Sequence, residues 1–290
     1  MRLLANNAQT LPSGLYFVAT PIGAARDITL RGLDILRDAD VLAAEDTRNT
    51  RHLLDIHGVT LNGRPLIPYH DHNGPVQRPR LMAMIAEGKS VAYVSDAGTP
   101  LIADPGFALA RAAIAGGFKV ITAPGASALL AALTVAGLPT DRFFFGGFLP
   151  PKSAARQKAL TELATVPGSL VFYESPKRVG KMLTDLVQVL GGDRQAAVCR
   201  ELTKKFEEVR RGALADIAGQ YADETPKGEI VVVVGPSPER PMDGDMLTTL
   251  LTTALAEQSS LKDAVAAVVA TTGLPRKQVY QAALEIEGEK

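Results

Sequence analysis

Short apolar runs alternate with helical segments through the first half of the chain, and this alternation limits the possible folds more than any other feature. The segments between the runs are roughly ten residues long and carry apolar residues at helical spacing. Strands separated by helices of this length form βαβ units, whose strands pair in parallel. We therefore expect an α/β domain with a mostly parallel sheet over residues 14–137. Its predicted strands cover residues 15–20, 40–46, 64–69, 91–94 and 119–124.

The pattern of predicted elements changes after Gly137. A strand within residues 138–151 indicates a hinge, and a helix, a strand and another helix follow it. Further strand-like segments then lie close together, with one short helix at residues 215–221 among them. Neighbouring strands without long helices between them are typical of antiparallel hairpins. We therefore expect residues 138–235 to form a second α/β domain with a mixed α+β sheet.

The last part of the chain, residues 236–290, is predicted to be a linker and a small helical appendage. Residues 236–245 are rich in Pro and Gly, which is typical of a linker. Three short helices are expected to begin near Met246, Leu261 and Arg276, and the last two resemble a helix-turn-helix. Acidic residues outnumber basic ones there, so packing or dimerisation is as good an interpretation as nucleic-acid binding.

The composition is that of a soluble globular protein, with 46% hydrophobic and 21% charged residues and a net charge of zero. The charge is uneven, because 12 basic and 7 acidic side chains lie between Lys152 and Arg211. That segment either faces a polyanion or is an ordinary solvated surface. The single cysteine, Cys199, excludes an internal disulfide framework. The N-terminus lacks the apolar region of a signal peptide, and the apolar runs are too short to span a bilayer. We expect a cytoplasmic protein with no membrane association.

Polar loops that contain glycine or paired carboxylates follow four of the predicted strands. Their positions are ATPIG (19–23), AEDTR (44–48), SDAGTP (95–100) and APGASA (123–128). The carboxyl ends of parallel strands converge on one crevice, where α/β proteins bind ligands. The loop before Gly106 is unusually long for a βα connection, which also favours a functional role. Asp96 suits ribose hydroxyls, and Ser127, near a helix start, suits an anionic group. These residues predict a nucleoside-like ligand without distinguishing a nucleotide, a dinucleotide or S-adenosylmethionine.

Several common site motifs do not occur in the chain. GxGxxG, CxxC and HExxH are absent, and the GKS at residues 88–90 precedes a strand instead of following one. His70 and His72 flank Asp71, but adjacent residues of an extended chain point to alternate sides. We therefore expect no metal site.

Long segments of the chain resemble the tetrapyrrole methylase superfamily, and more narrowly its ribosomal-RNA branch, the 16S rRNA cytidine 2′-O-methyltransferases. The resemblance covers about residues 14–235. It is carried by residues 19–48, by VAYVSDAGTPLIADPG (91–106), by PGASALLAAL (124–133) and by VFYESPKR (171–178). The resemblance implies a two-domain α/β fold, S-adenosylmethionine in the interdomain cleft and a homodimer. It also implies S-adenosylmethionine-dependent 2′-O-methylation of a cytidine ribose in the decoding region of 16S rRNA, in the small ribosomal subunit.

The resemblance also implies, by matching positions, which residues hold the cofactor. These are Pro21, Ile22, Ser95, Asp96, Gly98, Thr99, Ser127, Ala128, Tyr173 and Leu202, with Glu229 and Ile230 as further candidates. Small-molecule methylases of the superfamily carry a Gly-rich first loop and a Gly-Asp-Pro in the second loop. This chain has TPIG and SDAGTP there, which favours the RNA branch and leaves the contacts near Pro21 open.

A cluster after the second predicted strand supplies the catalytic candidates. Glu45 or Asp46 is expected to act as the base, and Arg48 to bind a phosphate. His70 is a rival base, and Tyr173–Ser175 is another candidate group. The alternative interpretation is that Asp46 and its neighbours only cap the following helix. Basic residues of the second domain are expected to bind the RNA backbone: Lys152, Arg156, Lys158, Lys177, Arg178 and Lys181.

Two other functions remain open from the sequence. The first is methylation of a small tetrapyrrole-like molecule, which requires a large apolar cleft and no basic rim. The second is a non-enzymatic RNA-binding scaffold, whose cleft does not bind S-adenosylmethionine.

Overall fold

The computed structural model consists of two compact units, which divide between Ser237 and Pro238. The first unit contains two α/β domains, each built around a five-stranded sheet, and the second is helical. The residues that the structure describes are 10–222, 224–237, 244–257, 260–272 and 274–288.

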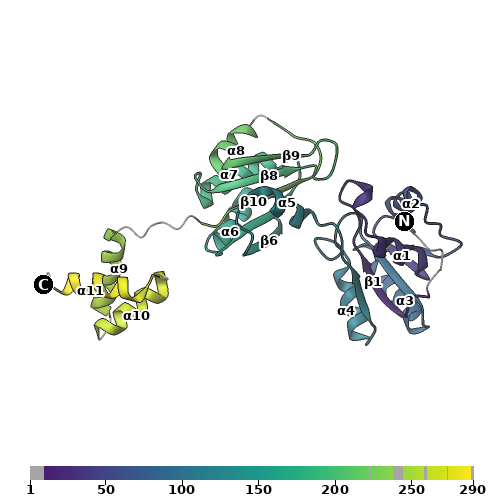
Figure 1. Ribbon diagram of the computed structural model, residues 1–290, viewed down its shortest axis with the longest axis horizontal. Coiled ribbons are helices and arrows are strands. Elements are labelled where there is room, and N and C mark those ends of the chain that lie inside the picture. The colour runs from purple at the N-terminus through teal and green to yellow at the C-terminus, as the bar shows by residue number, and fades with distance from the viewer. Residues whose placement is uncertain (1–9, 223, 238–243, 258–259, 273, 289–290) are drawn as a thin grey trace, which may run out of the picture. The chain divides into compact units, whose positions relative to one another are not determined.

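The first sheet is parallel throughout, in the order β3–β2–β4–β1–β5. Figure 1 shows its strand β1 with the helices of the same domain around it. Its strands are β1 (Gly14–Val18), β2 (Val41–Ala44), β3 (Leu66–Pro68), β4 (Ser90–Val94) and β5 (Val120–Ala123). The predicted α/β fold with a mostly parallel sheet is confirmed. Four of the predicted strands extend one or more residues beyond the observed ones, because polar strand ends continue into the loops, whereas β4 begins one residue before the predicted start.

Four helices cover the two faces of this sheet. They are α1 (Leu30–Asp38), α2 (Thr47–Ile56), α3 (Gly74–Ala86) and α4 (Phe107–Ala115). Tyr16 and Val18 of β1 lie in one core with residues of α1 and α2, whereas Leu15 and Phe17 lie in another core with residues of α3 and α4. The loops that leave β2 and β4 therefore lead to opposite faces. A crevice forms where adjacent strands diverge in this way.

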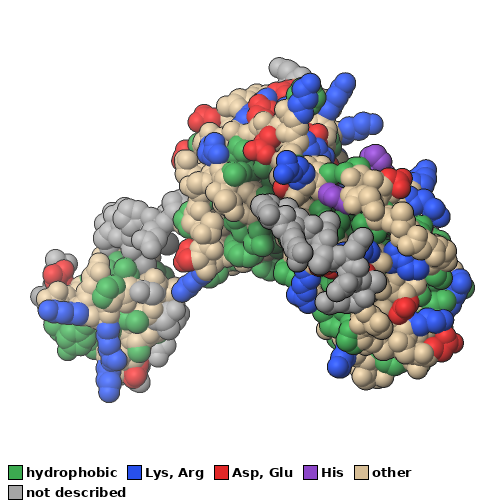
Figure 2. Space-filling view, turned by 45° about the vertical axis from the view of Figure 1, so that its right-hand side comes forward, with side chains coloured by type: hydrophobic (Ala, Val, Ile, Leu, Met, Phe, Trp, Pro, Cys, Tyr) green, Lys and Arg blue, Asp and Glu red, His purple; other side chains and the backbone are tan. Residues whose placement is uncertain are grey.

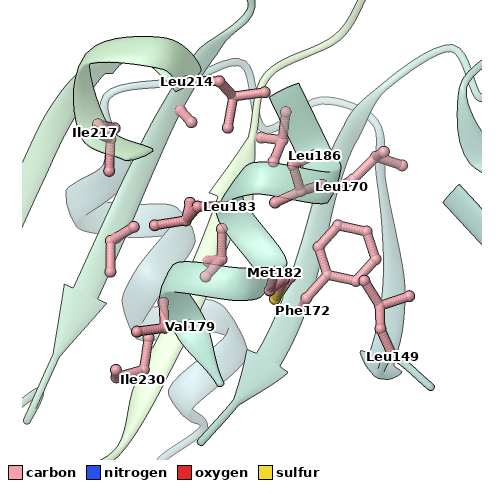
Figure 3. Packing of buried hydrophobic residues seen from close by; sticks show 14 of the residues in the cluster. Leu149, Leu170, Phe172, Val179, Met182, Leu183, Leu186, Leu214, Ile217 and Ile230 are labelled. Carbon is pink, nitrogen blue, oxygen red and sulfur yellow. The ribbon is translucent and has the colours of Figure 1, made fainter. Parts of the chain in front are cut away.

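The second sheet is mixed, in the order β6–β7–β10–β8–β9. Its strands are β6 (Phe143–Phe148), β7 (Ser169–Glu174), β8 (Gln195–Arg200), β9 (Glu208–Ala213) and β10 (Ile230–Val234). Strands β6 and β7 are parallel, and the other pairs are antiparallel, as the sequence predicts. One face is covered by α6 (Ser153–Leu163), α7 (Val179–Leu190) and α8 (Leu214–Gln220), and Figure 3 shows the apolar side chains that pack there.

Helix α5 (Ala128–Ala136) covers the other face of the second sheet. Its buried residues Leu129 and Leu133 pack with Val171 of β7 and Val233 of β10. The expected domain boundary after residue 137 places α5 with the first domain, whereas these contacts attach it to the second sheet. The start of α5 therefore lies where the two α/β domains meet.

The second unit consists of α9 (Gly244–Glu257), α10 (Leu261–Thr272) and α11 (Arg276–Gly288). It has an apolar core of its own, which includes Leu251, Val265 and Val279. Ser260 caps α10, because its hydroxyl accepts a hydrogen bond from the Asp263 N–H at 3.2 Å. Most of the expected linker, at residues 238–243, lies outside the described residues.

No helix in the described part of the chain is long and apolar enough to cross a membrane. No group of three or more His, Cys, Asp and Glu side chains among the described residues is arranged to hold a metal ion.

Cys199 is buried, and burial raises the pKa of its thiol to about 11, so packing accounts for this residue.

Candidate functional site

A cleft of about 420 Å³ lies between the two α/β domains of the first unit. The first domain contributes residues after β1, β2 and β4, and the second contributes the ends of β6, β7 and β10. Pockets of this size hold cofactor-sized ligands. The lining residues are Ile22, Glu45, Asp96–Thr99, Ile102–Asp104, Ser127, Ala128, Phe148, Tyr173–Pro176 and Gly228–Val231.

The loops after β2 and β4 are joined by two reciprocal hydrogen bonds. The Asp96 N–H donates to Glu45 Oε2 at 3.1 Å, and the Asp46 N–H donates to Asp96 Oδ1, also at 3.1 Å. The Asn49 amide donates to the same Asp96 oxygen at 3.3 Å. Both carboxylates are therefore oriented by groups of the neighbouring strand end.

The loop after β1 joins the same network. The backbone groups of Thr20 and Gly98 form a pair of hydrogen bonds, each 3.0 Å long. Gly98 has a φ of +78°, a conformation that favours glycine. The Thr99 hydroxyl donates to the Ala126 carbonyl at 2.9 Å, which attaches the β4 loop to the segment before α5. Three strand ends thus form one connected floor of the cleft.

Asp104 shapes the long loop before α4. Its carboxylate accepts hydrogen bonds from the N–H groups of Leu101, at 2.6 Å, and Gly106, at 2.7 Å. The Tyr93 hydroxyl donates to it at 3.4 Å. Leu101 and Ala103 have positive φ values of 71° and 62°, which non-glycine residues adopt only when their surroundings impose them. The carboxylate supplies that constraint and turns residues 102–104 toward the cleft.

The second domain covers the cleft through β7 and β10. The hydroxyl of Tyr173 accepts a hydrogen bond from the Leu129 N–H in the first turn of α5, at 3.2 Å. Burial raises the pKa of Tyr173, so this hydroxyl stays protonated at neutral pH. Beside it, Glu229 and Ile230 lie at the start of β10.

A loop after β8 contacts the first domain directly. The Ala24 N–H donates to the Thr203 hydroxyl at 3.0 Å. Lys204 in the same loop bonds to Glu201 at 2.8 Å and to Glu229 at 3.0 Å. The loop therefore connects the turn after β1 to the β10 edge of the cleft.

The charge inside the cleft is negative. Its lining includes the carboxylates of Glu45, Asp96, Asp104, Glu174 and Glu229, and no Lys or Arg is among the described lining residues. Burial raises the pKa of Glu45, and neighbouring carboxylates add to this shift. Asp46, outside the lining, differs, because a hydrogen bond from the Arg48 side chain lowers its pKa to about 2. The cleft therefore favours a cationic ligand and holds two carboxylates, Glu45 and Asp104, whose pKa is raised by burial.

Comparison with known proteins places this geometry in a family. The model of the Tetrapyrrole (Corrin/Porphyrin) Methylases matches residues 14–218. The chain belongs to this family. A second model, the RsmI C-terminal HTH domain, matches residues 241–287. The family predicted from the sequence is confirmed: the chain is a methyltransferase, with S-adenosylmethionine as the donor that family membership implies.

Individual relatives align with three quarters or more of the methyltransferase. Ribosomal RNA small subunit methyltransferase I of Mesorhizobium japonicum is 47% identical over 281 residues, which are 97% of this chain and 94% of that protein. A conserved hypothetical protein from Aeropyrum pernix K1 has a TM-score of 0.60 at 17% identity, over 96% of this chain and 98% of that chain. Uroporphyrin-III C-methyltransferase from Thermus thermophilus, solved with S-adenosylhomocysteine, has a TM-score of 0.53 at 19% identity, over 76% and 96%. At such identities the two solved structures show the fold alone.

The methyltransferase brings most of the predicted cofactor residues into the cleft. Those that line it are Ile22, Asp96, Gly98, Thr99, Ser127, Ala128 and Tyr173, with Glu229 and Ile230. Pro21 and Ser95 line an adjacent pocket of about 250 Å³, which also reaches Asp96. Leu202 is buried and lines a small pocket beside Ile22 and Ala128. All ten predicted residues thus lie in the cleft or in pockets that share residues with it, although no bound ligand tests their roles.

The predicted catalytic residues separate into two groups. Glu45 lines the cleft, whereas Asp46 and Arg48 lie outside its lining. Asp46 caps α2, because its carboxylate accepts the Arg48 N–H at 2.8 Å, and it also binds the Arg48 side chain at 2.7 Å. This agrees with the capping interpretation of these two residues. The rival base His70 also lies outside the cleft lining.

Arg156 is a correction to the predicted RNA-binding set. Its side chain is 3% exposed and forms an ion pair with Asp185 of α7 at 2.6 Å. It is therefore unavailable to phosphates. Arg178 is partly engaged, since it donates to the Leu149 carbonyl at 2.7 Å and pairs with Glu174 at 3.1 Å.

The remaining basic candidates are exposed. These are Lys152, Lys158, Lys177 and Lys181. Figure 2 shows Lys and Arg side chains projecting from the surface with acidic side chains among them, so the visible face carries no uniform basic patch.

Sequence reasoning missed several lining residues. Ile102, Ala103 and Asp104 lie in the long loop before Gly106, but after the SDAGTP motif (95–100) from which the site residues were predicted. Gly228 precedes β10, and its place depends on antiparallel pairing that the sequence does not specify. Phe148 ends β6, a strand parallel to β7, so the rule that carboxyl ends of parallel strands converge identifies it once that pairing is known.

Proposed function

We propose that this methyltransferase transfers a methyl group from S-adenosylmethionine to the ribose 2′-oxygen of a cytidine in the decoding region of 16S rRNA. The observation that carries the proposal is the 47% identity, over 97% of this chain, to a protein named ribosomal RNA small subunit methyltransferase I. The acidic cleft, with Glu45 held at its wall, supports it. The proposed substrate is the small ribosomal subunit, which places the reaction in the cytoplasm.

The cleft fits the methyl donor in size and in chemistry. S-adenosylmethionine carries a planar aromatic adenine, two cationic groups (a sulfonium and an ammonium) and one carboxylate, so its net charge is positive. The buried side chains of Ile22 and Val231, which lie in the same core, form an apolar wall for the adenine. The carboxylate of Asp96 supplies the opposite charge for the cations, whereas Glu229 is already paired with Lys204 at 3.0 Å. When bound, the donor supplies a methyl group on a sulfonium, which leaves as a neutral thioether.

Glu45 is the proposed general base. A ribose 2′-hydroxyl is weakly acidic, so a group that accepts its proton during transfer lowers the barrier. The raised pKa of Glu45 increases its affinity for that proton. The hydrogen bond from Asp96 fixes one carboxylate oxygen and leaves the other to face the substrate. Asp46 has a strongly lowered pKa and is the weaker base.

The charge distribution favours different binding surfaces for the different parts of the nucleotide. A negative cleft repels phosphates but accepts a neutral base and ribose. Exposed Lys152, Lys158, Lys177 and Lys181 of the second domain are proposed to bind the RNA backbone outside the cleft. Methylation of a small tetrapyrrole-like molecule is not favoured, because its several carboxylates would meet the same repulsion. The homodimer implied by the family resemblance remains part of the proposal.

The proposal is tested by methyl transfer to small ribosomal subunits from cells that lack this methyltransferase. The subunits are incubated with the chain and with S-adenosylmethionine carrying a tritiated methyl group, and the rRNA is then hydrolysed with alkali. A 2′-O-methyl group blocks cleavage of the adjacent phosphodiester, so label is expected in an alkali-resistant dinucleotide that contains cytidine. Subunits from cells that retain the enzyme are the control and are expected to take up little label.

Other outcomes contradict the proposal in different ways. Label in an alkali-released mononucleotide means methylation of a base. Donor binding without label in RNA means a small-molecule substrate. Absence of donor binding in calorimetry means that the fold serves as an RNA-binding scaffold.

A further inference from the structure

Strand β6 contains a β-bulge next to the cleft. Phe145 pairs with Val171, Gly147 with Phe172, and Phe148 with Tyr173, so one extra residue lies between Phe145 and Gly147. Side chains of a regular strand alternate between faces, and residues three apart point to opposite sides. The bulge restores Phe148 to the same face as Phe145 and Tyr173. Bulges commonly redirect a side chain in this way beside active sites.

Two glycines make the bulge possible. A Cβ atom on Gly146 would lie 2.5 Å from Cε1 of the buried Phe172 ring. Gly147 has a φ of +59°, which other residues adopt only with strain. The sequence FFFGGF therefore specifies a bulge at this point, which places Phe148 on the cleft face of the sheet.

Phe148 lies in the cleft lining but is not packed away. Its side chain is among the large hydrophobic groups that stay exposed, at 59%. Its ring contacts Tyr173 in a T-shaped arrangement, with centroids 5.7 Å apart, and Phe145 also contacts Tyr173, at 4.9 Å. Because Phe148 stays largely exposed despite this contact, ring surface is available to a ligand.

We propose that Phe148 stacks on the base of the target nucleotide and so positions its ribose for methyl transfer. This inference rests on the proposed function and assigns the base-binding residue of the same site. The apolar wall at Ile22 and Val231 is buried, which suits a cofactor held inside the cleft. The exposed Phe148 ring instead suits a group that arrives from a macromolecule. A ribose enters the cleft only with its base, and enzymes that modify nucleotides hold an extruded base by stacking on aromatic side chains.

The test compares Phe148→Ala with Phe144→Ala. Phe144 lies in the same strand and is 42% exposed, but it pairs with Leu170, whose side chain belongs to the opposite face of the sheet. Methyl transfer is measured on small subunits from cells lacking the enzyme, and S-adenosylhomocysteine binding is measured by calorimetry. Phe148→Ala is expected to lower kcat/KM for the subunits by roughly ten- to a hundredfold, from the usual strength of base stacking. Its affinity for S-adenosylhomocysteine is expected to stay within about twofold.

The conservative variant Phe148→Tyr retains an aromatic ring and is expected to recover most of the activity, and Phe144→Ala is expected to behave as the parent chain. Equal activity of Phe148→Ala and the parent overturns the inference. A matching loss of S-adenosylhomocysteine binding also overturns it, because Phe148 then belongs to the cofactor site. If the parent chain itself does not methylate the subunits, the proposed function fails instead.

Discussion

Glu45 and Asp96 hold each other across adjacent strand ends, since the Asp96 N–H donates to the Glu45 carboxylate at 3.1 Å and the Asp96 carboxylate accepts the Asp46 N–H at the same distance. Neither side chain can reorient without breaking a hydrogen bond to the other strand end. A base that is oriented before the substrate arrives loses little conformational entropy in the reaction. This pair is therefore the part of the cleft best prepared for proton transfer.

Replacing Glu45 by Gln is expected to reduce methyl transfer by about 10²- to 10⁴-fold, the usual contribution of a general base. Gln keeps the side-chain length and an oxygen that accepts the Asp96 N–H, so the fold and S-adenosylhomocysteine binding are expected to persist. Asp46→Asn is the matched control, because Asn also caps helices and Asp46 lies outside the cleft lining. Single-turnover rates on small subunits measure both. If Asp46→Asn has the larger effect, Asp46 and not Glu45 is the base.

The pH dependence of the reaction is expected to show the raised pKa of Glu45. The base acts as a carboxylate, so activity falls as the pH decreases through its pKa. Because burial raises that pKa, the fall begins at a higher pH than for a glutamate in water, whose pKa is about 4.3. A rate–pH profile measures this, and the residual activity of Glu45→Gln should lack the same acid limb. An identical limb in Glu45→Gln assigns the titration to another group.

Replacing Asp104 by Ala is expected to release the loop before α4. The Leu101 and Gly106 N–H groups lose their acceptor, and hydrogen bonds to a charged group contribute roughly 1.5–3 kcal/mol each. We expect the free energy of unfolding to fall by about 1–3 kcal/mol, because solvent replaces part of the lost bonding. S-adenosylhomocysteine should also bind more weakly, since residues 102–104 line the cleft. Urea denaturation and calorimetry measure the two effects. Asp104→Asn, which keeps an acceptor oxygen, should show a smaller loss, and equal losses contradict this role.

Arg156 and Lys158 lie two residues apart on α6, but their replacement by Ala is expected to change the stability of the fold by very different amounts. Arg156→Ala leaves Asp185 buried without its ion-pair partner, which typically costs about 3–5 kcal/mol of stability. Lys158→Ala removes an exposed side chain and should change stability by less than about 0.5 kcal/mol. Chemical denaturation distinguishes the two. A nearly neutral Arg156→Ala would mean that the ion pair does not hold α6 against α7.

The salt dependence of rRNA binding is expected to show whether the exposed lysines contact phosphates. A variant with Lys152, Lys158, Lys177 and Lys181 changed to Gln should bind rRNA more weakly and with a shallower salt dependence. Each lost phosphate contact lowers the slope of log K against log salt by about 0.7–0.9. Filter binding at several salt concentrations measures the slope. An unchanged slope places the RNA backbone on another surface.

The sequence predicts what depends on local pattern and misses what depends on long-range pairing. The alternating strands and helices, the Asp46 cap of α2 and the strand-end loops follow from short-range rules, and the structure has them. Arg156 was assigned to RNA binding because it is basic. Its burial could not be predicted, because its partner Asp185 lies 29 residues away in the sequence. Phe148 was missed because its direction depends on the bulge register with β7. The packing of α5 on the second sheet likewise follows from contacts across more than 30 residues.

The order of the first sheet has a consequence for how such enzymes diversify. The strands that carry Glu45 and Asp96 are fixed by their buried faces, whereas the segments beyond their carboxyl ends contribute little to either core. Mutations in these segments that preserve the hydrogen bonds of Glu45, Asp96 and Asp104 therefore leave the scaffold intact. A lineage with this topology can acquire a new substrate by loop replacement, while the strand ends continue to hold the same donor.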